Sequence, residues 1–199
     1  VLKGILATWR ATLDLSALIK PLLNVVLLLS LFMCGFAQQK RYVFTRISTK
    51  EGLASTHVYT IMQDKKELMW FGTANGLQRY DGRKIIMFRT AEPEGEYLPS
   101  RAISQIFIDK KGNFWARCGK EVGIFDPATF RYKRAKIKLD SEPPVRSDYL
   151  MWQDAAGNVY VIIKNHGFLT YDSVRHEFNA SKNRFHLPKG WRPTAMFED

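Results

Sequence analysis

Short apolar runs alternate with polar breaks from about residue 58 onward, and the same arrangement recurs along the chain. Runs of four to six residues bounded by turn-forming residues are typical of β-strands. In the first group, strands are predicted at Val58–Gln63, Leu68–Thr73, Leu77–Tyr80 and Lys84–Phe88. Between the last two, Asp81 and Gly82 predict a two-residue hairpin, because glycine accepts a positive φ.

A ten-residue pattern occurs three times, at Ile61–Trp70, Ile106–Trp115 and Met151–Tyr160. Successive copies start 45 residues apart, and the chain ends on Asp199, where a fourth copy of the aspartate falls. Residues that recur with the repeat are predicted to be structural, since they return in every unit. They are Asp64, Trp70, Gly76, Tyr80, Asp109, Trp115, Phe125, Asp154, Tyr160 and Tyr171.

A unit of four strands repeated about every 45 residues predicts an all-β fold of β-propeller blades, each a four-stranded antiparallel sheet. Helical repeats would need a period of 3.6 residues, which these segments lack. The predicted blades span approximately 53–97, 98–142 and 143–187, and a fourth begins at 188–199. Because propellers close with roughly four to eight blades, residues 38–199 are expected to form an incomplete ring. Residues 42–47 are a candidate for the strand that closes it.

The turn Asp-x-x-Gly-Asn begins at Asp109 and again at Asp154. Aspartate can accept hydrogen bonds from the backbone ahead of it, and glycine can adopt the left-handed conformation. In the first copy Glu67 replaces the glycine, so that turn is expected to differ. A calcium loop is the alternative, but one carboxylate and one asparagine fall short of the six or more oxygens that calcium requires. No metal, cofactor or catalytic group is predicted.

The N-terminal region has the features of a cleaved, helical signal peptide over residues 1–37. Lys20 precedes an apolar segment at Leu22–Met33, and the small residues Gly35 and Ala37 suit a cleavage site. About a dozen apolar residues are too few to span a bilayer as a helix. Lipidation of Cys34 is an alternative that the bulky Met33 disfavours. Export would leave Cys118 as the one thiol of the mature chain, where a packing role is expected.

The formal net charge of +11 at pH 7 raises the question of an acidic partner. The lysines and arginines are scattered, and the densest run, Arg131–Lys138, alternates with apolar residues as on a solvated strand face. An exported protein does not meet chromosomal DNA, so direct contact with nucleic acid is not expected.

The first unit is similar to the two-component regulator propeller repeat. The residues that carry the resemblance are Glu51–Ser55, Val58–Asp64 and the run Leu68–Gly82, with its Trp-Phe-Gly-Thr core. The resemblance extends over about residues 42–199. The resemblance weakens in the later units, where Trp115–Cys118 and then Tyr160–Ile163 replace that core. The predicted fold survives these departures, but a site inferred from the repeat consensus would not.

The resemblance implies the N-terminal periplasmic sensor region of a hybrid two-component histidine kinase, whose full-length receptor lies in the inner membrane. It implies an oligosaccharide or other small ligand, and a signal passed to a kinase that this chain lacks. The expected partners are the remaining blades, the downstream receptor modules and, as a possibility, a second copy in a homodimer.

Two other functions are open. A secreted propeller could be a protein-interaction scaffold, since an incomplete ring leaves strand edges exposed. A polysaccharide-active enzyme is less favoured, because no acid or nucleophile is spaced to serve a histidine. The histidines are His57, His166, His176 and His186.

A ligand site should break the repeat symmetry, so residues that differ between units are the better candidates for binding. The three that stand out are Arg117, Trp152 and His166.

Overall fold

The computed structural model describes residues 19–28, 43–88, 97–142, 147–181, 183, 187–188 and 190–194. The chain divides into two units, residues 1–45 and 46–199. In the first unit, residues 19–28 form a helix that overlaps the predicted apolar segment at residues 22–28. Cys34 and the cleavage site at residues 35–37 lie outside the described residues. A search of the described part found no helix long and apolar enough to cross a membrane.

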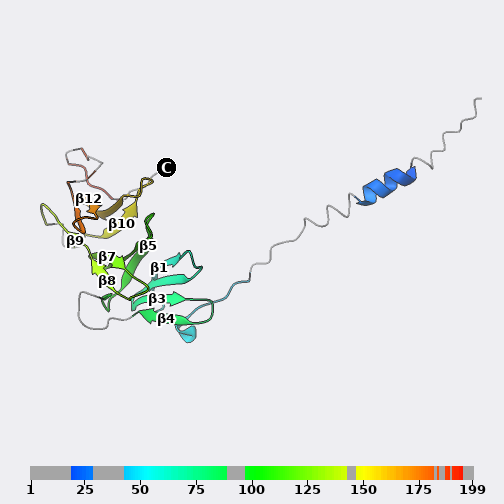
Figure 1. The fold of residues 1–199 in the computed structure, drawn as a ribbon, viewed down its shortest axis with the longest axis horizontal. Helices are drawn as coiled ribbons and strands as arrows, with labels where there is room; N and C mark the ends of the chain where they lie inside the picture. The colour runs from blue at the N-terminus through cyan, green and yellow to red at the C-terminus, as the bar shows by residue number, and fades with distance from the viewer. Residues whose placement is uncertain are drawn as a thin grey trace, which may run out of the picture. The chain divides into compact units, whose positions relative to one another are not determined.

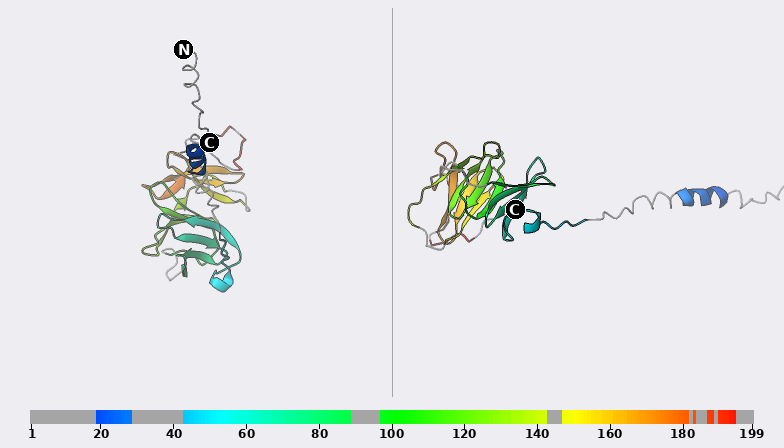
Figure 2. Two further views of the ribbon diagram at one scale, coloured as in Figure 1. Left: turned by 90° about the vertical axis from the view of Figure 1, so that its right-hand side faces the viewer. Right: turned by 90° about the horizontal axis from the view of Figure 1, so that it is seen from below.

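The described residues of the second unit form three sheets that follow one another in chain order (Figure 1; Figure 2). A short 3₁₀ helix, η1 (Thr49–Glu51), precedes them. The first sheet has β1 (Val58–Gln63), β2 (Met69–Thr73), β3 (Gly76–Tyr80) and β4 (Ile85–Phe88). The second has β5 (Ile103–Ile108), β6 (Phe114–Cys118), β7 (Glu121–Phe125) and β8 (Tyr132–Arg134). The third has β10 (Tyr149–Gln153), β11 (Val159–Ile163), β12 (Gly167–Asp172) and β13 (Glu177–Asn179), with β9 (Lys136–Ile137) at its edge.

The prediction of an all-β fold of four-stranded antiparallel sheets is confirmed, with one local difference. In the β3–β4 connection the Asp81 N–H donates to the Lys84 carbonyl at 3.3 Å, so the two loop residues are Gly82 and Arg83 rather than Asp81 and Gly82. The Asp81 carboxylate accepts from the backbone N–H groups of Arg83 and Lys84 at 2.8 and 2.7 Å, which stabilises the turn. Residues 43–47 are not in a strand of the described part of the chain. Their predicted partner is a blade beyond these residues, so a closing strand here stays a prediction; Tyr42 lies outside the described residues.

The short strand β9 belongs to the range predicted for the second blade and yet extends the third sheet. It pairs with β13 in parallel. The Lys136 N–H donates to the His176 carbonyl at 3.2 Å, and the Lys138 N–H to the Phe178 carbonyl at 2.8 Å. The chain that leaves the second sheet therefore fastens the outer edge of the third sheet before it enters β10.

Two apolar cores lie in the seams between neighbouring sheets. Trp70 fills the first seam, with its ring 5.3 Å from that of Phe88 and 4.8 Å from that of Phe114. Trp115 fills the second seam, with its ring 4.7 Å from that of Tyr171. Tyr160 is the equivalent ring on the far face of the third sheet. Each repeat thus directs one large aromatic ring towards the next sheet, and this burial is the main source of stability.

Gly72 allows the first and second sheets to approach at the backbone. A Cβ atom at Gly72 would lie 2.4 Å from Thr60 Cγ2 and 2.6 Å from the carbonyl oxygen of Ile103, which begins β5. The carbonyl cannot rotate away as a flexible side chain could. Glycine in the Trp-Phe-Gly-Thr core is therefore a packing requirement of the first seam.

Replacing Gly72 with alanine should destabilise the fold by about 1–3 kcal/mol, the usual cost of overpacking. Gly167→Ala is the matched control, because a Cβ there meets nothing within 4 Å. Urea unfolding followed by tryptophan fluorescence measures both variants. Equal stability of the two variants would contradict the close approach of the sheets.

The turn that contains Glu67 was expected to differ from its two repeats, and this expectation is wrong. Glu67 has φ 63°, against 86° for both Gly112 and Gly157. Its N–H donates to the Asp64 carbonyl at 3.0 Å, and the two glycines donate to the corresponding aspartates at 2.9 Å. The aspartate fixes the turn, so the glutamate is held in the left-handed region.

Glu67→Gly should therefore stabilise the protein by about 0.5 to 1 kcal/mol, since the left-handed strain outweighs the added freedom of the unfolded chain. The reciprocal variant Gly112→Ala should destabilise it by about 1 kcal/mol. The urea concentrations at the unfolding midpoints of the two variants give the sign of each stability change. A stability loss in Glu67→Gly would show that the strain is absent.

Candidate functional site

The repeated aspartates join each β-turn to the aromatic ring six residues later. Asp64 Oδ2 accepts from Trp70 Nε1 at 2.9 Å. The same bond, at the same length, joins Asp109 to Trp115 Nε1 and Asp154 to the Tyr160 hydroxyl. The other carboxylate oxygen accepts a backbone N–H four residues ahead, at 2.7 to 3.0 Å. Turn geometry and these bonds are sufficient to explain why the three aspartates and their rings recur.

Hydrogen-bond donors occupy the oxygens of these carboxylates. Asp109 Oδ2 also accepts from Asn113 Nδ2 at 2.8 Å, and Asp154 Oδ2 from Asn158 Nδ2 at 2.6 Å. An asparagine that presents its NH₂ group offers nothing to calcium, which binds oxygen. Among the described residues, no three His, Cys, Asp or Glu side chains are grouped to hold a metal ion.

The stability of the first turn depends on pH through the Asp64 carboxylate. Burial raises its pKa, but the bonds from Trp70 and from the Leu68 and Lys66 backbones outweigh burial and hold the pKa below its ordinary value. A depressed pKa contributes stability above the ordinary range near 4, and that contribution is lost as the pH falls through the lowered value.

The other recurring residues also have structural roles. Gly76 has φ 112° in the β2–β3 turn. The Tyr80 hydroxyl donates to the Gly82 carbonyl at 2.8 Å, and Phe125 is buried in the first seam. The Tyr171 hydroxyl lies 2.6 Å from His176 Nδ1. Every repeat mark is thus explained by turn geometry or packing.

Asp109→Ala should lower the free energy of unfolding by about 2–3 kcal/mol, because it leaves the buried Trp115 Nε1 without a partner and opens the turn. Asp140→Ala, on an exposed aspartate, is the control and should change stability by less than about 0.5 kcal/mol. Urea unfolding at neutral pH separates the two. A small effect of Asp109→Ala would mean that the bond is not structural.

The two ends of the stacked sheets differ in composition. We call one the aspartate end; it holds the turns β1–β2, β5–β6 and β10–β11, and adjacent turns touch there, with Lys110 Nζ donating to the Ala155 carbonyl. We call the other the variable end; it holds the turns β2–β3, β6–β7 and β11–β12. The variable turns share no sequence, and the third is one residue longer than the other two, so they are the better place for a binding site.

The structure places two of the three predicted ligand-binding candidates at the variable end. Arg117 is next to last in β6, and His166 lies in the β11–β12 turn. Trp152 lies near the aspartate end of β10, where its ring packs on Tyr160 with centroids 5.4 Å apart. Packing therefore accounts for Trp152, whereas no aromatic ring of the described residues packs on Arg117.

Arg117 is partly buried and incompletely hydrogen-bonded. Its Nη1 donates to the Gly119 carbonyl at 3.1 Å. Its Nε is buried and has no partner within the described part of the chain, and the same is true of Ser147 Oγ. Burial lowers the pKa of Arg117, and the nearby negative charge of Asp148 partly opposes this.

The histidines are not brought together. His176 bonds Tyr171 through Nδ1, and its Nε2 lies 3.2 Å from the Lys133 carbonyl across the second seam. Burial lowers the pKa of His176, in keeping with a neutral ring. The His57 backbone bonds Ser55 at the start of the first sheet, and His186 lies outside the described residues.

Cys118 is a buried free thiol in the first seam. Burial raises the pKa of this thiol to about 12, so it remains protonated at neutral pH. A protonated buried thiol is a poor nucleophile, which agrees with the predicted packing role.

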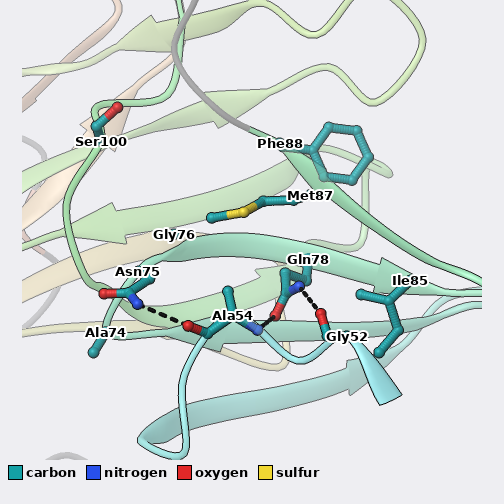
Figure 3. Close-up of a pocket in the computed structure, with 10 residues that line it drawn as sticks. All are labelled: Gly52, Ala54, Ala74, Asn75, Gly76, Gln78, Ile85, Met87, Phe88 and Ser100. Carbon is teal, nitrogen blue, oxygen red and sulfur yellow. Dashed lines mark hydrogen bonds between the residues drawn. The ribbon is translucent and has the colours of Figure 1, made fainter. Parts of the chain in front are cut away.

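A hollow of about 480 Å³ lies beside the first sheet and was not predicted. Its wall is held by side-chain amides: Gln78 bonds the Ala54 N–H at 2.7 Å and the Gly52 carbonyl at 3.0 Å. Asn75 Nδ2 bonds the Ala54 carbonyl at 2.7 Å (Figure 3). Met87 lies across from these amides. The sequence feature that could have indicated this hollow is Gln78, because the equivalent positions in the second and third sheets hold Gly123 and Leu169.

Comparison with known proteins gives the fold a family context. Residues 52–75 match the family model described as "Two component regulator propeller", which confirms the resemblance in the first repeat. The extracellular domain of a hybrid two component system, BT3049 from B. thetaiotaomicron, superposes with a TM-score of 0.57 at 18% identity over 70% of this chain. The extracellular domain of BT4673 from the same organism gives 0.54 at 20% identity over 73% of the chain.

The chain spans about a fifth of those solved structures, 20% of the first and 21% of the second. At these identities the likeness establishes the fold. No match was found among curated proteins.

Proposed function

We propose that this chain is the ligand-sensing propeller segment of a two-component signal transduction receptor. The observation that carries the proposal is the match of residues 52–75 to the regulator propeller family, within a stack of sheets that resembles extracellular receptor domains. A downstream histidine kinase, in a part of the receptor beyond these residues, would receive the signal.

The segment is exported to the periplasm in this proposal, with residues 1–37 as its signal peptide. The apolar run Leu22–Met33 and the small residues before Gln38 support export. The resemblance to extracellular domains is in keeping with that location.

The proposed ligand is an oligosaccharide bound at the variable end. This end carries the unsymmetrical residues Arg117 and His166, and the hollow lined by Asn75. The aspartate end is occupied by turns whose polar groups already bond one another. Signalling requires that the ligand bind one arrangement of the receptor better than another, and a site between sheets would meet that requirement.

Oligosaccharide binding should raise the unfolding temperature of the protein in proportion to the logarithm of ligand concentration. At a concentration about 100 times Kd the gain is about 2.7 kcal/mol. Thermal unfolding against a glycan library measures this, and a chain unfolded in urea is the control for nonspecific binding. A library that produces no shift would contradict the proposed oligosaccharide ligand.

Further blades of the same repeat are the proposed partners of the first sheet. Ile106 and Met151, which are 5% and 3% exposed, pack against the preceding sheet in their seams. Ile61, 45 residues before Ile106, is 59% exposed, and the neighbouring Tyr59 is 54% exposed. This open apolar face is what a further blade would cover. It is also the feature that favours the alternative function, a protein-interaction scaffold or homodimer.

Ile61→Lys distinguishes these partners. In the 199-residue chain it should change stability by less than about 0.5 kcal/mol, because Ile61 is exposed. In a longer product of the same gene it should cost about 2 kcal/mol or more, through an unpaired buried charge. Equal small effects in both, or a gene that encodes no further repeats, would favour the scaffold or the homodimer.

A further inference from the structure

One position in the outer turn of the second and third sheets is occupied by two chemically different rings. Phe130 lies two residues before Tyr132 in the second sheet, and His176 lies two residues before Phe178 in the third. Tyr132 and Phe178 are equivalent, since each pairs with the last aromatic repeat residue of its unit. The backbones of Phe130 and His176 are both left-handed, with φ 61° and 53°, which is uncommon for residues other than glycine.

Both rings reach the outermost strand of the preceding sheet. The Phe130 ring lies 5.3 Å from that of Phe88, the last residue of β4. His176 Nε2 lies 3.2 Å from the Lys133 carbonyl oxygen in β8, and the His176 carbonyl accepts from the Lys136 N–H of β9 at 3.2 Å. The first seam is thus joined at this edge by two hydrocarbon rings, whereas the second is joined by a ring that can take up a proton.

The partners of His176 determine which ring nitrogen carries the hydrogen. A carbonyl oxygen can only accept, so Nε2 donates to Lys133. Nδ1 then accepts from the Tyr171 hydroxyl, 2.6 Å away. Protonation of Nδ1 removes that acceptor, and the partly buried Tyr171 hydroxyl loses the bond that it donates.

The charges around His176 do not offset a proton on the ring. The titratable and charged groups on the surrounding elements are Asp109, Lys133, Arg134, Lys136, Tyr171, Asp172, Arg175 and Glu177. Both ring nitrogens bond neutral partners, and Glu177 pairs with Arg175 at 3.9 Å. Burial is the main cause that lowers the pKa of His176, the charge of Lys133 adds to it, and the bonds to the Lys133 and Arg134 backbones oppose it.

We propose that protonation of His176 weakens the attachment of the third sheet to the second, while the first seam, joined by Phe130, does not respond. The neutral ring is the form that the folded chain favours, so the unfolded chain binds more protons as the pH falls. The stabilisation is therefore complete above the ordinary histidine pKa near 6.5 and is lost as the pH falls through the lowered value. No ligand takes part, so the inference goes beyond the proposed sensor function.

Hydrogen exchange of the full chain, read by mass spectrometry between about pH 7.5 and about pH 5, tests this inference. This range lies above the ordinary pKa values of carboxylates. After correction for the intrinsic pH dependence, protection of the Lys136 and Lys138 amides of the second seam should fall as the pH is lowered. The fall is up to about tenfold for each unit by which folding lowers the pKa of His176. Protection in β4, at the first seam, should stay constant.

His176→Gln should abolish this fall, because a glutamine amide can donate to the Lys133 carbonyl and does not titrate in this range. The matched control is His57→Gln, on an exposed histidine whose backbone bonds Ser55; it should leave the fall unchanged. Constant protection of the Lys136 and Lys138 amides in the unmodified chain would overturn the proposal, and so would a fall that persists in His176→Gln.

An NMR titration of the His176 ring in the unmodified chain gives an answer even if His176→Gln does not fold. The expected result is a neutral ring with its hydrogen on Nε2 and a pKa below the ordinary value near 6.5. A hydrogen on Nδ1 in the neutral ring, or a pKa at or above that value, would overturn the proposal. None of these outcomes depends on whether the chain binds an oligosaccharide.

Discussion

The hydrogen bond from a buried aromatic ring to the aspartate six residues before it is the interaction on which the three sheets depend. It closes the first hairpin of each sheet and satisfies the one polar atom of a large ring. Trp70 and Trp115 can then fill the seams without an unpaired donor. Because the bond recurs with the 45-residue repeat, each sheet presents the same aromatic surface to the next.

A binding site has to use positions that are not fixed by the repeat. The aspartate end of every sheet is committed to turns, whereas the variable end tolerates different residues. At the first seam that tolerance is limited by Gly72, whose neighbour is backbone. At the second seam Arg117 stands where the repeat would place that glycine, so the same limit does not recur there.

Most of the fold could be predicted because it depends on local pattern. Alternation and turn residues located the strands of the first sheet to within a residue at either end, and the spacing of Asp64, Asp109 and Asp154 showed the repeat. The parallel strand β9 could not be predicted, since two residues carry no periodicity and their partners lie 41 residues further along the chain. The expectation that Glu67 would change its turn was wrong, because Asp64 determines the turn and the glycine of the other repeats does not. Of the site candidates, Arg117 was identified by its departure from the repeat.

Hydrogen exchange of the tryptophan indole N–H groups, followed by NMR, tests the central interaction most directly. The structure predicts slow exchange for Trp70 and Trp115, whose Nε1 atoms donate to Asp64 and Asp109. Trp191, which is 70% exposed, should exchange fast and serves as the internal reference. Exchange of Trp70 and Trp115 at the rate of Trp191 would show that the aspartate–aromatic bonds do not hold the sheets.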